Sequence, residues 1–223
     1  MTLYPLGDTV GHVTLIDSMG TDITVVNAAR VSFAKESGYA DGYGKMKEED
    51  IRLIKYLAKH KHWTPFSQPQ VQLRIKMPLF VARQWYKHQV GFTRNEVSRR
   101  YVSDTPECYI TRQWRAASEN IKQGSSPYTI AVDQELIEDM TYTAIGVYKD
   151  LIRSGVCPEQ ARMVLPQSTF TEFVEVGSLA AYARLYSLRS SEDAQKETRD
   201  YANSIGIILR TLFPHSWAAL TEA

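Results

Sequence analysis

Apolar and polar residues alternate along two short stretches of the chain, a rhythm typical of half-buried strands. The clearer case is residues 71–77, in which every second side chain is apolar. A period of two places one row of side chains on a buried face of a sheet. We therefore expect a strand there and another over residues 10–18, which ends in a turn at Met19 and Gly20. A third strand is expected over residues 169–176.

A helical period instead governs residues 48–59, where Ile51, Ile54, Leu57 and Ala58 fall on one face. Acidic residues open this segment and basic residues close it, which suits the helix dipole. Four more helices are expected along the chain. They cover residues 79–88 after Pro78, residues 133–154 before Gly155, residues 178–188, and residues 192–212 before Pro214.

Two segments are expected as loops, residues 36–46, which are rich in Gly and Tyr, and residues 87–101, which leave a predicted helix. Strands and helices are mixed without a regular βαβ repeat, so the predicted fold class is α+β. Of the 223 residues, 43% are hydrophobic, which is enough for one sizeable core. We expect a single domain over residues 1–223.

Charge and composition argue against several classes of protein. The formal net charge is +1, so a basic site must be local and no nucleic-acid partner is expected. No apolar run approaches the ~20 residues that span a bilayer, and the first ten residues lack the features of a signal peptide. We therefore expect a cytoplasmic protein without a membrane partner. Lysines flank His60 and His62 and would repel a cation, so no metal site is expected.

The densest chemistry lies in residues 87–101, which hold four Lys or Arg, one His and one Glu. Phosphate is bound by Arg together with hydroxyl donors, and residues 98–101 read Ser-Arg-Arg-Tyr. Asn95 and Glu96 could contact the donor and acceptor edges of a heterocycle. From these residues alone, two interpretations stay open. The segment either binds a small phosphorylated nucleotide or is a solvated basic loop, which could contact RNA.

More arginines follow downstream, at Arg162 and Arg189, near expected helix ends. They are either charges that the helix dipole favours or groups that converge with Arg100 on one phosphate. No G-x-G-x-x-G follows a strand, and no G-x-x-x-x-G-K-[ST] is present. A dinucleotide, if bound, would therefore not use the usual phosphate-binding loops.

Six ordered motifs resemble those of one known family, the flavin-dependent thymidylate synthases called ThyX. They are residues 29–33, 62–66, 80–88, 95–101, 161–166 and 188–195, which together span nearly the whole chain. The family hallmark is Arg-His-Arg, seven residues and then Ser. Here it reads Lys87, His88 and Gln89, with eight residues before Ser98, and Asp193 replaces a family His. The chain is thus most similar to a divergent subgroup of some bacterial viruses, whose enzymes act in a bacterial host cytoplasm.

The resemblance implies a homotetramer with FAD at subunit junctions. It also implies transfer of one carbon from methylenetetrahydrofolate to C5 of dUMP, with NADPH as the reductant. The matching catalytic positions are Ser98, His88 and Arg189. The matching cofactor-binding positions are Ser32, His62, Thr64, Lys87, His88, Gln89, Glu96, Ser178 and Arg184. The matching substrate-binding positions are Gln84, Lys87, Glu96, Ser98, Arg99, Arg100, Arg162 and Arg189.

Three further expectations concern roles within that site. No His or Lys stands at a fixed short offset to activate Ser98, so Ser98 is expected to be a nucleotide ligand rather than a nucleophile. Gln89 removes one charge from the hallmark, and we expect Arg94, inside the longer spacer, to swing toward the site and replace it. Around each flavin, residues 78–101 and 178–189 are expected to come from different subunits.

Two other interpretations stay open. One is a family relative that methylates another pyrimidine nucleotide or an RNA uridine. The other is a non-catalytic nucleotide-binding or RNA-binding protein with basic and aromatic residues interleaved. Bound FAD would exclude the second interpretation, and analysis of the product formed from dUMP would decide the first.

Overall fold

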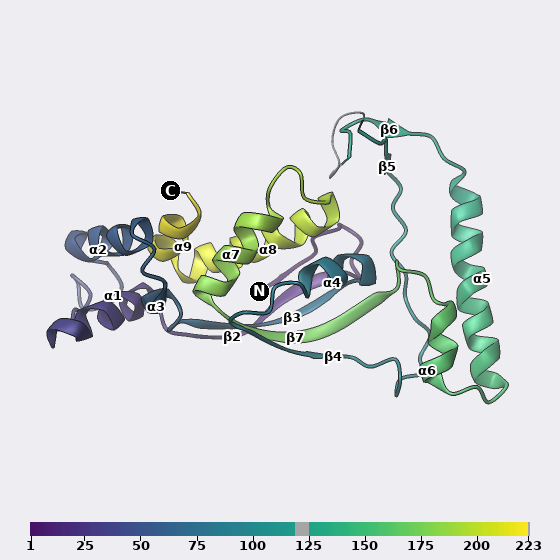
Figure 1. Ribbon diagram of the computed structural model, residues 1–223, viewed down its shortest axis with the longest axis horizontal. Helices are drawn as coiled ribbons and strands as arrows, with labels where there is room; N and C mark the ends of the chain where they lie inside the picture. The colour runs from purple at the N-terminus through teal and green to yellow at the C-terminus, as the bar shows by residue number, and fades with distance from the viewer. Residues whose placement is uncertain (119–124, 223) are drawn as a thin grey trace.

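The computed structural model describes residues 1–118 and 125–222, and its centre is a five-stranded sheet (Figure 1). The strands lie in the order β1-β2-β3-β7-β4, and every neighbouring pair is antiparallel. They are β1 (Thr2–Leu3), β2 (His12–Met19), β3 (Gln70–Pro78), β7 (Phe170–Ser178) and β4 (Phe92–Glu96). A separate two-stranded sheet pairs β5 (Trp114–Arg115) with β6 (Thr129–Ile130). The long strands β2, β3 and β7 thus form the middle, and β4 is an edge strand.

Helices cover one face of the sheet and stand at both of its ends. They are α1 (Asp22–Arg30), α2 (Glu48–Lys59), α3 (Trp63–Phe66), α4 (Leu79–Trp85), α5 (Gln134–Arg153), α6 (Pro158–Ala161), α7 (Leu179–Arg189), α8 (Lys196–Leu212) and α9 (Pro214–Thr221). Two 3₁₀ helices, η1 (Val31–Phe33) and η2 (Arg162–Val164), follow α1 and α6. In Figure 1, α4, α7 and α8 lie over the sheet, α1, α2, α3 and α9 gather at one end, and α5 and α6 stand at the other.

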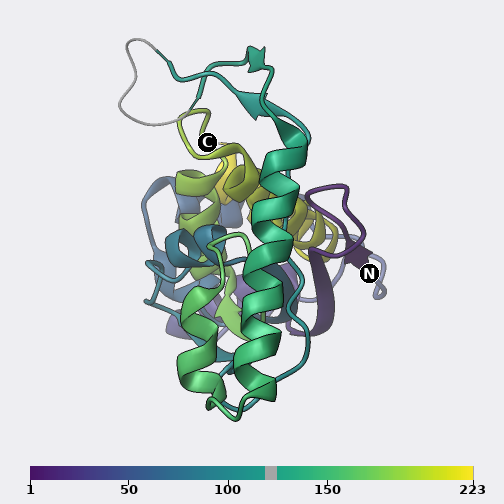
Figure 2. The ribbon, with the colours of Figure 1, turned by 90° about the vertical axis from the view of Figure 1, so that its right-hand side faces the viewer.

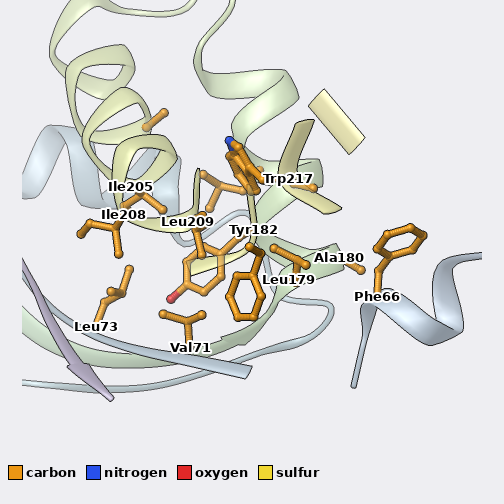
Figure 3. Close-up of a cluster of buried hydrophobic side chains, with 14 of the residues drawn as sticks. Phe66, Val71, Leu73, Leu179, Ala180, Tyr182, Ile205, Ile208, Leu209 and Trp217 are labelled. Atoms are coloured by element: carbon orange, nitrogen blue, oxygen red, sulfur yellow. The ribbon is translucent and has the colours of Figure 1, made fainter. Parts of the chain in front are cut away.

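The core lies between the sheet and the helices above it (Figure 3). Alternation along β3 directs Val71, Leu73 and Ile75 toward these helices, and none of the three has exposed surface. In Figure 3, Val71 lies beneath Tyr182 of α7, and Leu73 lies beneath Ile208 of α8. Burial of this apolar row is the reason that the alternating segment forms a strand.

The first turn of α1 is joined to the last helix, α9, through the side chain of Asp22. The buried carboxylate of Asp22 accepts hydrogen bonds from the backbone N–H groups of Ser216 at 2.8 Å and His215 at 3.0 Å. These two groups belong to the first turn of α9, where helix N–H groups have no helical partner. Trp217, one residue further on, is fully buried, with its ring centroid 5.2 Å from that of Tyr186. The last helix is therefore part of the core.

The helix α5 forms an arm that stands away from the sheet, beside α6 (Figures 1 and 2). It is capped by Asp133, the residue before its first turn, whose side chain accepts a hydrogen bond from the Leu136 N–H. Leu136, Met140 and Val147 lie on one side of this helix, because spacings of four and seven residues keep side chains on one face. All three are exposed in the described part of the chain. The arm therefore presents an apolar stripe to its surroundings.

The α+β class is confirmed, and the expected strands and helices are present with three corrections. The helix expected over residues 79–88 ends at Trp85. The segment expected as a loop over residues 87–101 contains the strand β4. Its rhythm was hidden because Arg94, a charged residue, occupies the central inward-facing position. The helix expected from residue 192 begins at Lys196 instead.

Within the described residues, α1 and α9 were not expected from the pattern, nor were the single-turn helices α3 and α6. Pro214 does end α8, but it also occupies the first position of α9, where proline is well tolerated. Within residues 1–118 and 125–222, no helix is long and apolar enough to cross a membrane.

Candidate functional site

A cleft of about 520 Å³ opens where β4 ends. Its walls include Glu96, Ser98 and Arg99 from β4 and the following turn, Arg162 from η2 and Thr171 from β7. The turn forms because the Ser98 carbonyl accepts hydrogen bonds from two N–H groups three and four residues later, at 3.0 and 3.2 Å. We call this space the anion cleft, since two guanidinium groups and a hydroxyl line it.

The charges in the anion cleft are only partly satisfied by the protein. The Arg99 guanidinium donates to the backbone carbonyl of Asp104 at 2.7 Å, and that of Arg162 donates to the carbonyl of Glu159 at 3.3 Å. Neither forms an ion pair with any residue in the described part of the chain. Arg100 does not line the cleft but lies beside it, 3.5 Å from the Glu159 carboxylate. The cleft therefore keeps positive charge that can meet an anion.

A second cluster contains Gln84, His88 and Arg189, none of which lines the anion cleft. Arg189 Nε donates to His88 Nε2 at 2.9 Å, and Arg189 Nη2 donates to the Gln84 carbonyl at 3.1 Å. A ring nitrogen that accepts a hydrogen bond carries no proton, so His88 is neutral here. Burial lowers the pKa of His88 from 6.5 to about 4, and the nearby positive charges of Arg189, Arg94 and Arg184 act in the same direction.

The His88 ring is expected to titrate near pH 4 in a histidine NMR titration of the folded protein. Because the folded pKa lies below the unfolded one, His88 contributes stability that is fully present above about pH 6.5 and lost as the pH falls toward about 4. Arg189→Ala removes one of the neighbouring charges and should move the midpoint upward. A midpoint near 6.5 in the wild-type protein would contradict the neutral acceptor role.

A chain of polar contacts leads from this cluster to a second cleft of about 1280 Å³. The Gln84 amide donates to Gln195 Oε1 at 2.6 Å, and the Gln195 amide donates to Glu197 Oε2 at 3.0 Å. Arg115, from β5, donates to both Glu197 oxygens at 2.8 and 3.0 Å. Burial opposes ionisation of Glu197, but the bonds from Arg115 lower its pKa overall. Arg115 and Glu197 line the second cleft together with Tyr109.

The expected flavin positions fall in two places. In the first place, Ser178 caps α7 and Arg184 lies within this helix, and both are next to the turn at Val90 and Gly91. Arg184 Nη2 donates a hydrogen bond to the Val90 carbonyl at 2.8 Å. Gly91 has φ +83°, and a Cβ there would lie 2.9 Å from the Cβ of Ala181, so only glycine permits this approach. Lys87 and Gln89 are exposed beside the same turn.

Ser32, His62 and Thr64 lie in the second place, on η1 and around α3. All three are exposed. The His62 ring stands 6.1 Å from that of Tyr56 on α2. The backbone just after α3 reaches α7, because the Leu179 N–H donates to the Pro69 carbonyl at 3.1 Å. The two places are thus linked through the first residue of α7.

The structure brings Glu96, Ser98, Arg99 and Arg162 together. Within one chain it does not bring Arg189 to them. The expectation that Arg100 converges with Arg162 does not hold within one chain, because Arg99 lines the cleft and Arg100 is turned to Glu159 instead. The expectation that residues 78–101 and 178–189 come from different subunits around each flavin does not hold for His88 and Arg189, because these two side chains of one chain are hydrogen bonded.

The expected role of Arg94 is also wrong. Its guanidinium is paired with the buried carboxylate of Glu175 on β7, so it does not swing out to replace the charge lost at Gln89. The sequence signal for this pairing would have been Glu175 itself, an acid among apolar residues in an expected strand. Arg115 and Glu197 were missed too, and their separation in the chain left no local signal.

The chain matches the family model described as Thy1, Thymidylate synthase complementing protein, over residues 14–215. It is 37% identical over 215 residues to a flavin-dependent thymidylate synthase of Thermus thermophilus, covering 95% of this chain and 76% of that one. To the enzyme of that name in Thermosipho africanus it is 36% identical over 220 residues, covering 95% and 91%. Among solved structures it is similar to the UMP/dUMP methylase PolB from Streptomyces cacaoi bound with 5-Br dUMP, with a TM-score of 0.78, 27% identity and 93% of each chain covered.

Proposed function

Because this chain belongs to the family of flavin-dependent thymidylate synthases, we propose that it converts dUMP to dTMP. Methylenetetrahydrofolate supplies the methylene group, and a hydride from NADPH brings that group to the methyl level. The two folate nitrogens that held the methylene group each take up one proton, one released from C5 of dUMP and one from solvent, which gives tetrahydrofolate. NADP⁺ is the oxidised product. FAD, when bound, supplies the two-electron transfer from NADPH.

The anion cleft is the observation that carries the substrate class. The phosphate of dUMP is dianionic near neutral pH, and charge-assisted hydrogen bonds from Arg are the strong contacts for such a group. Arg99 and Arg162 face the cleft without carboxylate partners among the described residues, and Ser98 adds a hydroxyl donor. Glu96 Oε1 accepts a hydrogen bond from Thr171 at 2.5 Å, which leaves its second oxygen for the nucleoside.

Arg189 and His88 are suited by their chemistry to contact the uracil ring of the nucleotide. Arg189 is held by a neutral imidazole and a backbone carbonyl rather than by a carboxylate. Its positive charge is therefore available to negative charge on the uracil ring, which grows when C5 acts as a nucleophile. The low pKa of His88 keeps that arrangement intact at neutral pH.

The residues around the Val90–Gly91 turn fit a flavin dinucleotide by their chemistry. Lys87 and Arg184 are exposed and offer cations for a diphosphate, and the N-terminus of α7, which the buried Ser178 caps, favours negative charge nearby. Gly91 brings backbone close to α7 without a side chain. Ser32, His62 and Thr64 add exposed hydroxyls and an aromatic ring at the other place. This donor set supports FAD binding without the usual phosphate-binding loops.

We also infer that the working enzyme is a homotetramer with sites shared between subunits. Gln84, His88 and Arg189 do not line the anion cleft of their own chain, and a shared site would supply them from another subunit. The apolar stripe of Leu136, Met140 and Val147 on α5 offers a surface that a second copy can cover.

A second candidate substrate is UMP. It is favoured by the similarity to PolB, whose name describes a UMP/dUMP methylase. The two nucleotides differ only in the ribose 2′-OH, so the test is direct competition. Equal amounts of dUMP and UMP are offered with methylenetetrahydrofolate and NADPH, and the methylated products are separated by chromatography. A uridine-containing RNA in a parallel reaction tests the polymer as acceptor.

The purified protein is expected to take up FAD and to show the absorbance bands of oxidised flavin. Added dUMP and methylenetetrahydrofolate should then produce dTMP and tetrahydrofolate, with one NADPH oxidised for each dTMP. Omission of dUMP is the control for uncoupled NADPH oxidation. A protein that stays colourless with excess FAD, or that forms no dTMP, would contradict the proposed function.

A further inference from the structure

Glu175 is a buried carboxylate in the middle of β7, with no exposed surface. It faces the helices, and it joins three elements. Arg94 of β4 forms an ion pair with it, and the Trp85 indole of α4 donates to its Oε1 at 3.4 Å. Burial raises the pKa of this carboxyl, and the charge of Arg94 counteracts the rise only in part. A buried carboxylate is costly unless it is paired, so this position depends on Arg94.

Arg94 is enclosed in the same place. Its side chain is 14% exposed. The guanidinium carbon lies 4.7 Å from the centre of the Phe92 ring and 5.6 Å from that of Tyr86. Both distances are within the range of cation–π attraction. The side chain is therefore fixed on three sides, by a carboxylate and two aromatic rings.

The pairing of β4 with β7 places Arg94 directly opposite Glu175. A shift of β4 by one residue would turn Thr93 or Asn95 inward and Phe92 outward. A shift by two residues would place either Phe92 or Glu96 opposite Glu175. With Phe92 opposite, the buried carboxylate of Glu175 would be unpaired. With Glu96 opposite, two carboxylates would face each other. Only the observed register satisfies the charge on Glu175.

Two further bonds favour the same register, from the Thr171 hydroxyl to Glu96 and from the Val97 N–H to the Glu172 carbonyl at 2.8 Å, but neither satisfies the buried charge of Glu175. The remaining constraints are weaker. β4 is an edge strand of five residues whose one sheet neighbour is β7. The turn before it is adaptable, with Gly91 at φ +83° and the Phe92 N–H bonded to the Gln89 carbonyl at 3.1 Å. Phe92 packs over Gly177, but an apolar contact is less directional than an ion pair. The spacer of eight residues between Gln89 and Ser98 therefore does not by itself define where Ser98 lies.

We propose that Arg94 is a positioning residue: through Glu175 it fixes the register of β4 and so places Glu96 and Ser98 in the anion cleft. Because Trp85 bonds to the same carboxylate, the ion pair also sets β4 relative to α4, which carries Gln84. The effect on nucleotide binding rests on the proposed function, whereas the effect on the strand register does not.

The test variant is the double substitution Arg94→Met with Glu175→Met. Arg94→Met alone would leave Glu175 buried without a partner and should lose much stability, whereas the double variant keeps the core filled with apolar side chains. The matched control replaces Arg74 and Glu172 by Met. These residues form a 2.7 Å ion pair between β3 and β7, and Arg74 is exposed.

In the double variant, amide hydrogen exchange of residues 92–98 is expected to be about tenfold faster or more, because the strand samples other registers. Binding of dUMP, measured by calorimetry, should weaken by about tenfold or more, while FAD uptake is retained. The control should match the wild type in both measurements. Arg94→Lys keeps the charge without the planar fork and should fall between the two.

Wild-type exchange protection and wild-type dUMP affinity in the folded double variant would overturn the positioning role. In that case, the pair would only fill the core. If the wild-type protein fails to bind dUMP, the proposed function is what fails, and the exchange of residues 92–98 still decides whether Arg94 sets the register.

Discussion

Variants Arg162→Ala and Arg189→Ala, each impaired alone, are expected to regain activity when their subunits are mixed. On the proposed function, each removes charge-assisted hydrogen bonds to the nucleotide, which should cost on the order of 1.5–3 kcal/mol, or roughly 10- to 150-fold in kcat/KM for dUMP. If the anion cleft of one subunit works with the Arg189 cluster of another, random mixing restores both arginines in about a quarter of the sites.

The measurement is dTMP formation at low dUMP after reversible dissociation, with mixed tetramers verified by mass spectrometry. The matched control pairs Arg189→Ala with His88→Ala. These two residues are hydrogen bonded within one chain, so neither variant can supply an intact cluster and no recovery is expected. Mixed tetramers of Arg162→Ala and Arg189→Ala that stay as inactive as their parents would show that each site is built from one chain.

Trp217→Ala is expected to lower the free energy of unfolding by about 3–5 kcal/mol, the range for deleting a large aromatic side chain from a core. Trp217 is fully buried in α9 and packs edge-on against Tyr186. Its indole nitrogen has no hydrogen-bond partner among the described residues, so the loss is one of packing. Urea unfolding followed by circular dichroism gives the value.

Trp217→Phe is the matched variant for this experiment. It keeps an aromatic ring and removes the unpaired indole N–H, so it should lose much less stability than Trp217→Ala. A Trp217→Ala protein within about 1 kcal/mol of the wild type would mean that α9 is dispensable for the core.

Much of the fold could be predicted because its apolar rows follow regular periods. The segment 71–77 is buried at every second residue, and the helix over residues 48–59 has the expected bounds. The edge strand β4 could not be predicted, because its inward-facing row contains Arg94 and Glu96. A charge on a buried face becomes reasonable only when its partner is known, and Glu175 lies some eighty residues away.

The candidate site shows the same limit. Local sequence placed Ser98 beside two arginines and suggested that Arg162 joins Arg100 there, but it could not tell that Arg99 rather than Arg100 faces the cleft with Arg162. The contact between Arg189 and His88 joins residues about a hundred positions apart, and that between Arg115 and Glu197 is similarly distant. Such contacts are properties of the tertiary structure, and no spacing rule in the chain encodes them.

The pairing of β3 with β7 has a consequence for how the protein folds. Gln70 lies opposite Ser178, so the centre of the sheet joins segments about a hundred residues apart. Contacts between such distant segments form slowly, because a long loop must close before they are made. During synthesis β3 emerges well before its partner, and its free edge is then available to other strands. The nascent chain is therefore expected to depend on chaperone protection until β7 has left the ribosome.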